Sequence, residues 1–334
     1  MVKNMKISVV IMAYNRQNFI KQALTSCLEQ TLPSEMYEII VLKNFDYTPI
    51  IENKRGVSIR FIKYTNEKIG EMIIKGVEAA TYNTISFLDD DDIFAPSKLE
   101  LILKYFSENS ELIFIRNNIQ IFTNYLKIEK KEKKHMIKFF LDDLNKKSIF
   151  RAINIGGYLN TSSMSISKEI VLKRRSLIEK QEIGTDITLF YIALSEPRGK
   201  LMFTDEPLTF YRFHNSLSHL AVSQDEGYLL KLKETTLKNI CSLKRIESFI
   251  EDSIIRDILS LSISSWKVQL SLISEEYIDY STFIESLKFS LFRRKIIILF
   301  TTLISPFNNR FSKKYFTKLF VILDGYRMRN RKFL

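Results

Sequence analysis

Four consecutive aspartates, Asp89 to Asp92, follow directly on the apolar run Ile85–Leu88 and precede Ile93–Pro96. Four carboxylates within about 13 Å of extended chain repel one another, so a cation is expected to compensate them. An acidic run in a linker would simply be solvated, but this run is attached to a segment with the pattern of a buried strand. Carboxylate oxygens are ligands that Mg²⁺ and Mn²⁺ accept. The run therefore predicts a divalent-metal site that carries a phosphate-rich ligand.

The segments ahead of the aspartates predict a strand–helix–strand unit. Lys6–Ala13 is a nearly continuous β-branched run, typical of a strand buried on both faces of a parallel sheet. Apolar residues then recur at helical spacing from Phe19 to Leu28, and Tyr37–Leu42 predicts a second strand. Further strands are predicted at Ser58–Tyr64 and Thr84–Leu88, and a helix is predicted between them at Glu71–Ala80. This alternation predicts an α/β fold with a mostly parallel, Rossmann-like central sheet.

Polar residues stand at the carboxyl ends of three of these strands. They are Tyr14, Lys43–Asn44 and Asp89–Asp92. In open α/β sheets, ligands bind outside the carboxyl ends of the strands. We therefore expect the three strand ends to face one cleft.

The second half of the chain predicts a looser α/β segment followed by helices. Helices are predicted at Lys98–Phe106 and Glu182–Leu194, and strands at Ser162–Ser167 and within Leu201–Phe213. Beyond Gly227 the periodicity is helical, which indicates a domain boundary near residue 220. The predicted organisation is a domain over 1–220, with a nucleotide-binding half (1–95) and an acceptor half (96–220), and a helical region over 221–334.

Composition is that of a folded protein. The 334 residues are 46% hydrophobic and 26% charged. Cys27 and Cys241 lie far apart without metal-ligand spacing, which predicts two reduced core residues and a cytosolic location. Because the chain runs through Lys3 and Lys6 straight into a strand, no signal peptide is expected.

Three segments together resemble the family 2 glycosyltransferases of the GT-A fold: Val9–Arg16, Tyr37–Leu42 and Phe87–Asp92. The resemblance covers roughly residues 6 to 215, with the motifs in the family's order and spacing. It implies an inverting transfer of a sugar from a nucleoside-diphosphate donor to a hydroxyl acceptor. It also implies a Mg²⁺ or Mn²⁺ cofactor, which as a Lewis acid neutralises the charge that grows on the leaving diphosphate.

The same resemblance gives the aspartates unequal roles. Asp89 is expected on the nucleotide side of the donor, and Asp91 is expected to be the principal metal ligand. Asp90 or Asp92 could share either role. For Asp92, a structural role as a cap of the turn before Pro96 is an equal alternative.

Aromatic and basic groups complete the expected donor site. The ring of Tyr14 is expected to pack on the nucleobase, and Arg16 to reach the phosphate or the base. The full predicted set of donor-binding residues is Ala13, Tyr14, Asn15, Arg16, Asn44, Asp89 and Asp90.

The sequence departs from the family at the second strand end. The usual Asp-Asp-Gly-Ser is replaced by Lys43–Asp46, so Asn44 offers an amide in place of a carboxylate. A common Arg-Asn pair is replaced by Ile73–Ile74. These departures leave the base open, with UDP favoured over GDP.

The expected general base lies in Gly184–Leu189, which matches the family's Glu-Asp-x-x-Leu with Thr185 in the glutamate position. We therefore expect Asp186 to deprotonate the acceptor hydroxyl. His214 lies in a segment that resembles the family's Y-R-x-H-x-x-S-x-S, and it is expected to contact the metal or the diphosphate.

The C-terminal end is strongly basic. From Thr282 to Leu334, twelve Lys or Arg stand against two acidic residues, within a formal net charge of +12 for the chain. The apolar stretch from Ile296 is only about ten residues long, which is too short to span a bilayer. With the apolar segment Tyr315–Tyr326, this end predicts peripheral binding to the anionic cytoplasmic face of a membrane. The alternative is a helical extension with a solvated basic face.

Such binding would suit a glycan or polyprenyl-linked acceptor. Nucleic-acid binding is not expected, because the C-terminal end is highly apolar and no nucleic-acid motif accompanies it. A non-catalytic sugar-nucleotide- or glycan-binding subunit of a membrane assembly is a second interpretation. A nucleotidyltransferase is a third, but Tyr14–Arg16 does not form the glycine-rich phosphate loop that this class ordinarily carries.

Overall fold

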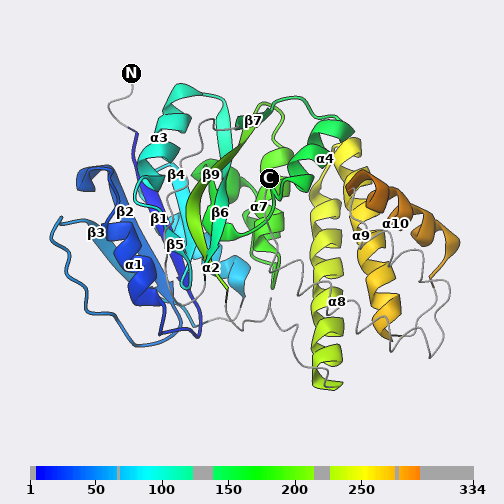
Figure 1. The fold of residues 1–334 in the computed structure, drawn as a ribbon, viewed down its shortest axis with the longest axis horizontal. Coiled ribbons are helices and arrows are strands. Elements are labelled where there is room, and N and C mark those ends of the chain that lie inside the picture. The colour runs from blue at the N-terminus through cyan, green and yellow to red at the C-terminus, as the bar shows by residue number, and fades with distance from the viewer. Residues whose placement is uncertain (1–4, 66–67, 123–137, 214–225, 275–277, 294–334) are drawn as a thin grey trace. The chain divides into compact units, whose positions relative to one another are not determined.

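The computed structural model describes residues 5–65, 68–122, 138–213, 226–274 and 278–293 (Figure 1). The chain divides into two compact units. The first comprises Met1–Asp143 and Gly156–Phe213, and the second comprises Leu144–Ile155 and His214–Leu334. The segment Leu144–Ile155, which lies inside the predicted domain 1–220, thus groups with the C-terminal helices.

The first unit is built on a nine-stranded mixed sheet, in the order β3-β2-β1-β4-β8-β6-β9-β5, with β7 paired to β9. Figure 1 shows β3, β2 and β1 side by side with α1 lying across them. The strands are β1 (Ile7–Ala13), β2 (Tyr37–Lys43), β3 (Ser58–Lys63), β4 (Thr84–Asp89), β5 (Ile93–Phe94), β6 (Leu112–Phe122), β7 (Lys138–Leu141), β8 (Met164–Ser167) and β9 (Lys200–Arg212).

The helices of this unit are short and lie mostly between strands. They are α1 (Ile20–Leu28), α2 (Ile69–Ala79), α3 (Lys98–Glu108), α5 (Lys168–Lys173), α6 (Arg175–Ile178) and α7 (Thr185–Leu194), with the 3₁₀ turns η1 (Ser34–Met36) and η2 (Thr161–Ser163).

The parallel strands confirm the predicted strand–helix–strand unit and bring the expected strand ends together. β1 pairs in parallel with both β2 and β4. In this register Ala13 lies beside Lys43, and Met12 lies beside Asp89. The three predicted strand ends are therefore neighbours at one edge of the sheet.

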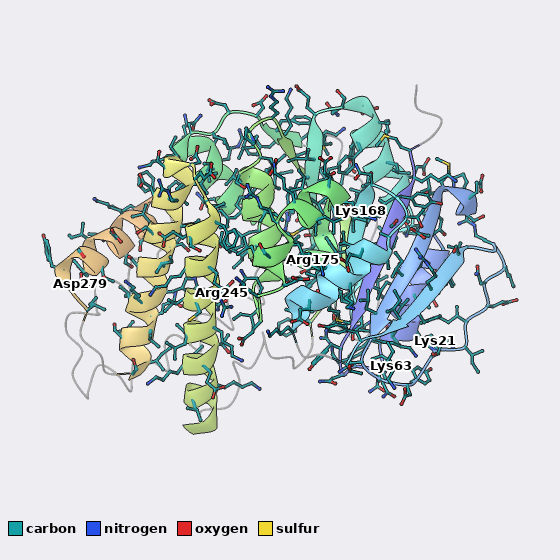
Figure 2. The ribbon with its side chains drawn as sticks, turned by 180° about the vertical axis from the view of Figure 1, so that it is seen from behind. Lys21, Lys63, Lys168, Arg175, Arg245 and Asp279 are labelled. Atoms are coloured by element: carbon teal, nitrogen blue, oxygen red, sulfur yellow. The ribbon has the colours of Figure 1, made fainter. Side chains whose placement is uncertain are left out.

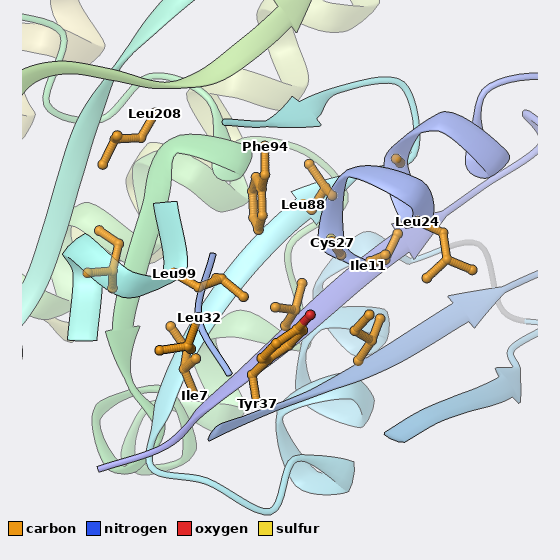
Figure 3. Packing of buried hydrophobic residues seen from close by; sticks show 14 of the residues in the cluster. Ile7, Ile11, Leu24, Cys27, Leu32, Tyr37, Leu88, Phe94, Leu99 and Leu208 are labelled. Carbon is orange, nitrogen blue, oxygen red and sulfur yellow. The ribbon is translucent and has the colours of Figure 1, made fainter. Parts of the chain in front are cut away.

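The core beneath this edge is closely packed. Ile11, Cys27 and Leu88 are all fully buried within one hydrophobic cluster (Figure 3). On the other face, α2 approaches β1 and β2 closely at Gly76, where an added Cβ would lie 2.5 Å from Val10 Cγ1. An added side chain at this position would force Val10, Leu42 or the helix itself to shift, so the glycine allows the close approach.

Several predicted boundaries shift in the structure. The helix predicted from Glu182 begins at Thr185, after Gly184, whose φ of +68° starts the helix from a left-handed residue. The strand predicted from Ser162 begins at Met164, because Ser162 lies in the 3₁₀ turn η2. The long strand β6 was not predicted at all.

Ion pairs join the outer elements of this unit. On α6, Arg175 bonds to Glu179 at 2.7 Å and pairs with Glu78 of α2 (Figure 2). Both contacts are largely exposed, so they contribute little to stability compared with the buried sheet.

The second unit contains α4 (Lys146–Asn154), α8 (Glu226–Phe249), α9 (Ser253–Ser274) and α10 (Tyr280–Arg293). The ring of Phe150 stacks on that of Phe292 with centroids 4.7 Å apart. At the start of α10, Asp279 accepts a hydrogen bond from the N–H of Thr282 at 2.8 Å and caps the helix (Figure 2). α4 and α10 are thus joined by side-chain packing across about 140 residues of sequence.

Two expectations fall on this unit. Cys241 is exposed, so its prediction as a core residue is wrong, because it lies on an exposed face of α8, whereas Cys27 is buried as predicted. Within the described residues, no helix has the length and apolar character needed to cross a bilayer. The basic segment beyond Arg293, with Tyr315–Tyr326, lies outside the described residues.

Candidate active site

Arg16 is a cation that bonds directly to two carboxylates of the aspartate cluster. It lies just beyond β1, and its Nη2 forms an ion pair with Asp90 Oδ1 at 2.7 Å. Its Nη1 bonds to a carboxylate oxygen of Asp91. One guanidinium therefore bridges two neighbouring carboxylates, as its planar fork of donors allows. This contact was not anticipated, because phosphate or base was the expected partner of Arg16.

Asp90 is turned into the protein rather than toward solvent. Its side chain is fully buried, and Oδ2 accepts a hydrogen bond from the N–H of Tyr14 at 3.1 Å. Burial raises the pKa of Asp90 to about 8, even though Arg16 lowers it. Asp90 thus ties the end of β1 to the end of β4.

Asp92 ties the same turn to two distant segments. Its Oδ1 accepts a hydrogen bond from the N–H of Arg212 at 2.9 Å, and its Oδ2 accepts one from Asn160 Nδ2 at 3.0 Å. Burial and the neighbouring Asp91 together raise the pKa of Asp92 to about 6. Both oxygens of Asp92 are therefore engaged within the protein.

Asp89 can offer its carboxylate to a ligand directly, whereas Asp91 would first exchange its bond to Arg16 for one to the ligand. The Asp89 carboxylate is partly exposed and accepts no hydrogen bond from the residues that the structure describes. Its N–H donates to Ser162 Oγ at 2.9 Å, which fixes the end of β4. Burial, together with Asp92 and Asp91, raises the pKa of Asp89 well above its usual range. Such a site favours a bound cation, because a cation relieves the repulsion.

Arg212 holds the backbone of Asp91 in place. The guanidinium lies between two aromatic rings, 4.6 Å from the centroid of Phe19 and 4.5 Å from that of Phe122. Its Nε donates to the carbonyl oxygen of Asp91 at 2.8 Å, and its Nη2 bonds to Gln22. The sequence does not predict this role, because Arg212 lies about 120 residues from the aspartates along the chain.

At the neighbouring strand ends, Asn15 and Asn44 bond to each other. The N–H of Asn15 donates to Asn44 Oδ1 at 2.8 Å, and Asn44 Nδ2 donates to Asn15 Oδ1 at 2.6 Å. Asn15 has a φ of +59°, a conformation that asparagine tolerates better than most residues. The pair joins the end of β1 to the end of β2.

Lys43 does not point toward this site. Its Nζ donates to the carbonyl oxygens of Asp46 at 3.1 Å and Tyr47 at 2.9 Å, and to Thr48 Oγ1. The ammonium therefore holds the loop after β2. At this strand end it is Asn44, bonded to Asn15, that lies beside the end of β1.

Asp186 lies in the first turn of α7, as predicted. Its Oδ1 accepts a hydrogen bond from the N–H of Ile187 at 2.9 Å, and its Oδ2 accepts one from the N–H of Asn160 at 3.2 Å. Burial raises the pKa of Asp186, while these backbone N–H groups lower it. A carboxylate with a raised pKa is a stronger base once it is ionised.

The donor set suits a divalent cation. Among the described residues, no three His, Cys, Asp or Glu side chains are grouped as a complete protein cage for a metal. Mg²⁺ is usually held by one or two carboxylates together with substrate phosphates and waters, and Asp89 and Asp91 offer hard oxygen ligands of that kind. His214, the other predicted ligand, lies outside the described residues.

Comparison with known proteins identifies the fold and the family. Residues 8–173 match the family model for Glycosyl transferase family 2. The chain carries a family 2 glycosyltransferase domain. An uncharacterized glycosyltransferase of Nostoc sp. is 24% identical over 259 residues, which is 75% of this chain and 76% of that relative. One from Haemophilus influenzae is 26% identical over 224 residues, 64% of this chain and 71% of the relative.

A solved structure confirms the predicted GT-A fold of this glycosyltransferase. Staphylococcus aureus TarS 1–349 in complex with UDP-GlcNAc superimposes with a TM-score of 0.56 at 13% sequence identity. The similarity covers 97% of this chain and 92% of the TarS chain. The resemblance drawn from the three strand-end motifs is therefore correct in both family and fold.

Proposed function

We propose that this glycosyltransferase moves a sugar from a nucleoside-diphosphate donor to an acceptor hydroxyl with inversion at the anomeric carbon. The observation that carries the proposal is that Asn160 bonds to both Asp186 and the aspartate cluster. Its backbone N–H donates to Asp186, and its side-chain amide donates to Asp92. A carboxylate of raised pKa is thus linked by two hydrogen bonds to Asp92, whose neighbour Asp91 is proposed to hold the metal. UDP is the proposed nucleotide, since the structurally similar TarS is recorded with UDP-GlcNAc.

In the proposed reaction, Asp186 accepts the proton of the acceptor hydroxyl. The hydroxyl oxygen forms a bond to the anomeric carbon as the bond from that carbon to the diphosphate oxygen breaks. The electron pair of the broken bond leaves with the nucleoside diphosphate. Attack opposite the leaving group inverts the anomeric configuration, and Asp186 ends the step protonated.

On the donor side, Asp91 and Asp89 would hold a Mg²⁺ or Mn²⁺ ion. When bound, such an ion neutralises the negative charge that grows on the diphosphate. Tyr14 and Asn44 are proposed to contact the base, and Arg16, once released from Asp91, the phosphates. Asp90 and Asp92 keep the turn in place, because both are bonded into the protein.

For the acceptor, we propose a glycan or a polyprenyl-linked saccharide on the cytoplasmic face of a membrane. The support is the basic and apolar composition from Thr282 to Leu334. Flotation with liposomes tests this directly. The full chain should float with vesicles that contain anionic lipid and not with neutral vesicles, and a chain truncated at about residue 282 should lose flotation. Unchanged flotation after truncation would refute the membrane role of this segment.

The catalytic proposal is tested in two steps. A thermal-shift screen of nucleoside diphosphates with Mn²⁺ or Mg²⁺ should give the largest stabilisation with UDP. Asp186→Asn should then keep the UDP-dependent shift and lose transfer from the corresponding UDP-sugar. Transfer that survives Asp186→Asn overturns the assignment of the base. Binding of UDP without turnover of any UDP-sugar by the wild type favours the non-catalytic binding subunit.

A further inference from the structure

Asn160 occupies a backbone conformation that few residues adopt. It precedes the 3₁₀ turn η2 with φ of +67° and ψ of 110°. These angles lie outside the broad β and right-handed α regions and beyond the usual left-handed well. Asparagine is enriched among the non-glycine residues at positive φ, because its short polar side chain can bond locally. The position is therefore held by specific contacts.

Each polar group of the residue makes its own contact, and the carbonyl oxygen accepts from Ser163 Oγ at 2.8 Å. The side-chain Oδ1 accepts from the N–H of Ser163 at 3.1 Å and caps η2. The side-chain Nδ2 donates to Asp92 Oδ2 at 3.0 Å. The backbone N–H donates to Asp186 Oδ2 at 3.2 Å. The asparagine side chain supplies the acceptor and the donor on two separate atoms, so that both bonds form at once.

The bonds on either side extend this link into the sheet and into α7. The second oxygen of Asp92 accepts from the N–H of Arg212 on β9 at 2.9 Å. The second oxygen of Asp186 accepts from the N–H of Ile187 at 2.9 Å. Asn160 is thus the residue through which the turn after β4 and the first turn of α7 are connected.

A buried lysine holds the turn that follows Asn160. Lys98 Nζ donates to the carbonyl oxygen of Ser162 at 2.5 Å and to Thr209 Oγ1 at 2.9 Å. Ser162 Oγ in turn accepts from the N–H of Asp89 at 2.9 Å. The η2 turn is therefore fastened to the same strand end that carries the aspartates.

We infer that Asn160 is a positioning residue that sets the distance and orientation of the Asp186 carboxylate relative to the aspartate cluster. The inference rests on the proposed function, because it assigns Asp186 as the base. A base displaced by about 1 Å from a productive geometry can lower a rate by about a hundredfold. Asn160 itself contacts neither donor nor acceptor in this scheme.

The test compares Asn160→Gly with a matched control. Glycine accepts the positive φ and keeps the backbone N–H and the carbonyl oxygen that accepts from Ser163. It removes only the side-chain bonds to Asp92 and to the N–H of Ser163. The control is Asn145→Gly, since Asn145 caps α4 in the same way, by accepting from the N–H of Ser148 at 2.9 Å. Full-length proteins are assayed for transfer from the UDP-sugar that the wild type uses, and for UDP binding with Mn²⁺.

We expect Asn160→Gly to lower kcat by about 30- to 100-fold while KM for the donor and Kd for UDP change by less than about threefold. Asn145→Gly should leave all three values near those of the wild type. An equal loss in both variants, or a loss in Asn160→Gly confined to KM, would show a purely structural cap and overturn the inference.

A second variant keeps the test valid if Asn160→Gly misfolds. Asn160→Asp keeps an acceptor for Ser163 and a residue type that tolerates positive φ, but it loses the donor to Asp92. It should show the same selective loss of kcat. If both variants transfer sugar at the wild-type rate while Asp186→Asn is inactive, the inference on Asn160 fails and the proposed function stands. If Asp186→Asn is fully active, the proposed base fails first and the inference falls with it.

Discussion

The guanidinium of Arg16 forms an ion pair with Asp90 and bonds to Asp91, the residue proposed to hold the metal. A protein cation and a metal ion would therefore compete for the same carboxylate. The Arg16 side chain is about one-third exposed, so it has room to leave the carboxylate and turn toward a phosphate. In the absence of the sugar-nucleotide donor, Arg16 is therefore a counter-ion of the aspartates. When the sugar nucleotide is bound, Arg16 is a candidate contact for its phosphates.

Arg16→Gln is expected to raise the affinity for Mn²⁺ in the absence of nucleotide. The gain should be up to about fivefold, because a partly exposed ion pair contributes up to about 1 kcal/mol. Mn²⁺ binding is measured by calorimetry or by electron paramagnetic resonance. The matched control is Lys63→Gln, which removes the same charge from an exposed pair with Asp46. Equal or weaker Mn²⁺ binding by Arg16→Gln would contradict the competition.

Asp90→Asn is expected to stabilise the protein more at pH 9 than at pH 5, in EDTA and without nucleotide. Burial raises the pKa of Asp90 to about 8, above the value near 4 of an unfolded aspartate. The folded state therefore binds this proton more tightly. The resulting stability is fully present below about pH 4 and is lost as the pH rises through 8. Asparagine cannot ionise, and it keeps an oxygen for the N–H of Tyr14.

Thermal denaturation at the two pH values measures this effect. The melting temperature of Asp90→Asn relative to wild type should rise by a few degrees between pH 5 and pH 9. Asp46→Asn is the control, since the bond to Lys63 lowers the pKa of Asp46 and both pH values lie above it. Its difference from wild type should not change between pH 5 and pH 9. A pH-independent difference for Asp90→Asn as well would rule out ionisation of Asp90 as the cause.

The parts of the fold predicted from sequence are those with an uninterrupted pattern. Ile7–Ala13 and Tyr37–Lys43 are buried along their whole length, so their apolar runs indicate central strands. The parallel pairing of β1 with β2 places Tyr14 beside Asn44 at one edge, and the parallel pairing of β1 with β4 brings the aspartates to the same edge. In contrast, the middle of β6 contains Arg116, Asn117 and Asn118. These polar residues interrupt the apolar pattern from which a buried strand is predicted.

The supporting residues of the site could not be predicted for a different reason. Asn160 and Arg212 reach Asp92 from 68 and 120 residues away, and no local pattern encodes such contacts. Lys98 stands at the start of an amphipathic helix, where a lysine ordinarily faces solvent, yet it is fully buried. Only the tertiary fold shows that these side chains serve the aspartate turn.

Arg212→Lys is expected to weaken binding of UDP with Mn²⁺ by about tenfold and to lower the melting temperature. Lysine keeps the charge but loses the planar group that lies between Phe19 and Phe122 and that donates to the carbonyl oxygen of Asp91. The loss should therefore loosen the turn that presents Asp91. Arg60→Lys is the control, because Arg60 pairs with Glu38 at 2.7 Å, outside the proposed donor site. If both variants bind UDP equally well, Arg212 does not support the donor site.

The rate of transfer is expected to fall at acidic pH. The apparent pKa of this fall should lie above the usual aspartate pKa, which is about 4. Asp186 must be ionised to accept the acceptor proton, and burial raises its pKa. Below that pKa the ionised fraction, and with it kcat/KM, should drop about tenfold for each pH unit. The profile is measured at saturating metal with donor binding followed in parallel, so that loss of donor affinity is separated from loss of base.

Asp186→Glu should keep some activity with an altered profile, and Asp186→Asn should lose at least about a thousandfold in transfer rate. An acid limb that remains unchanged in Asp186→Asn would assign the titrating group elsewhere in the site.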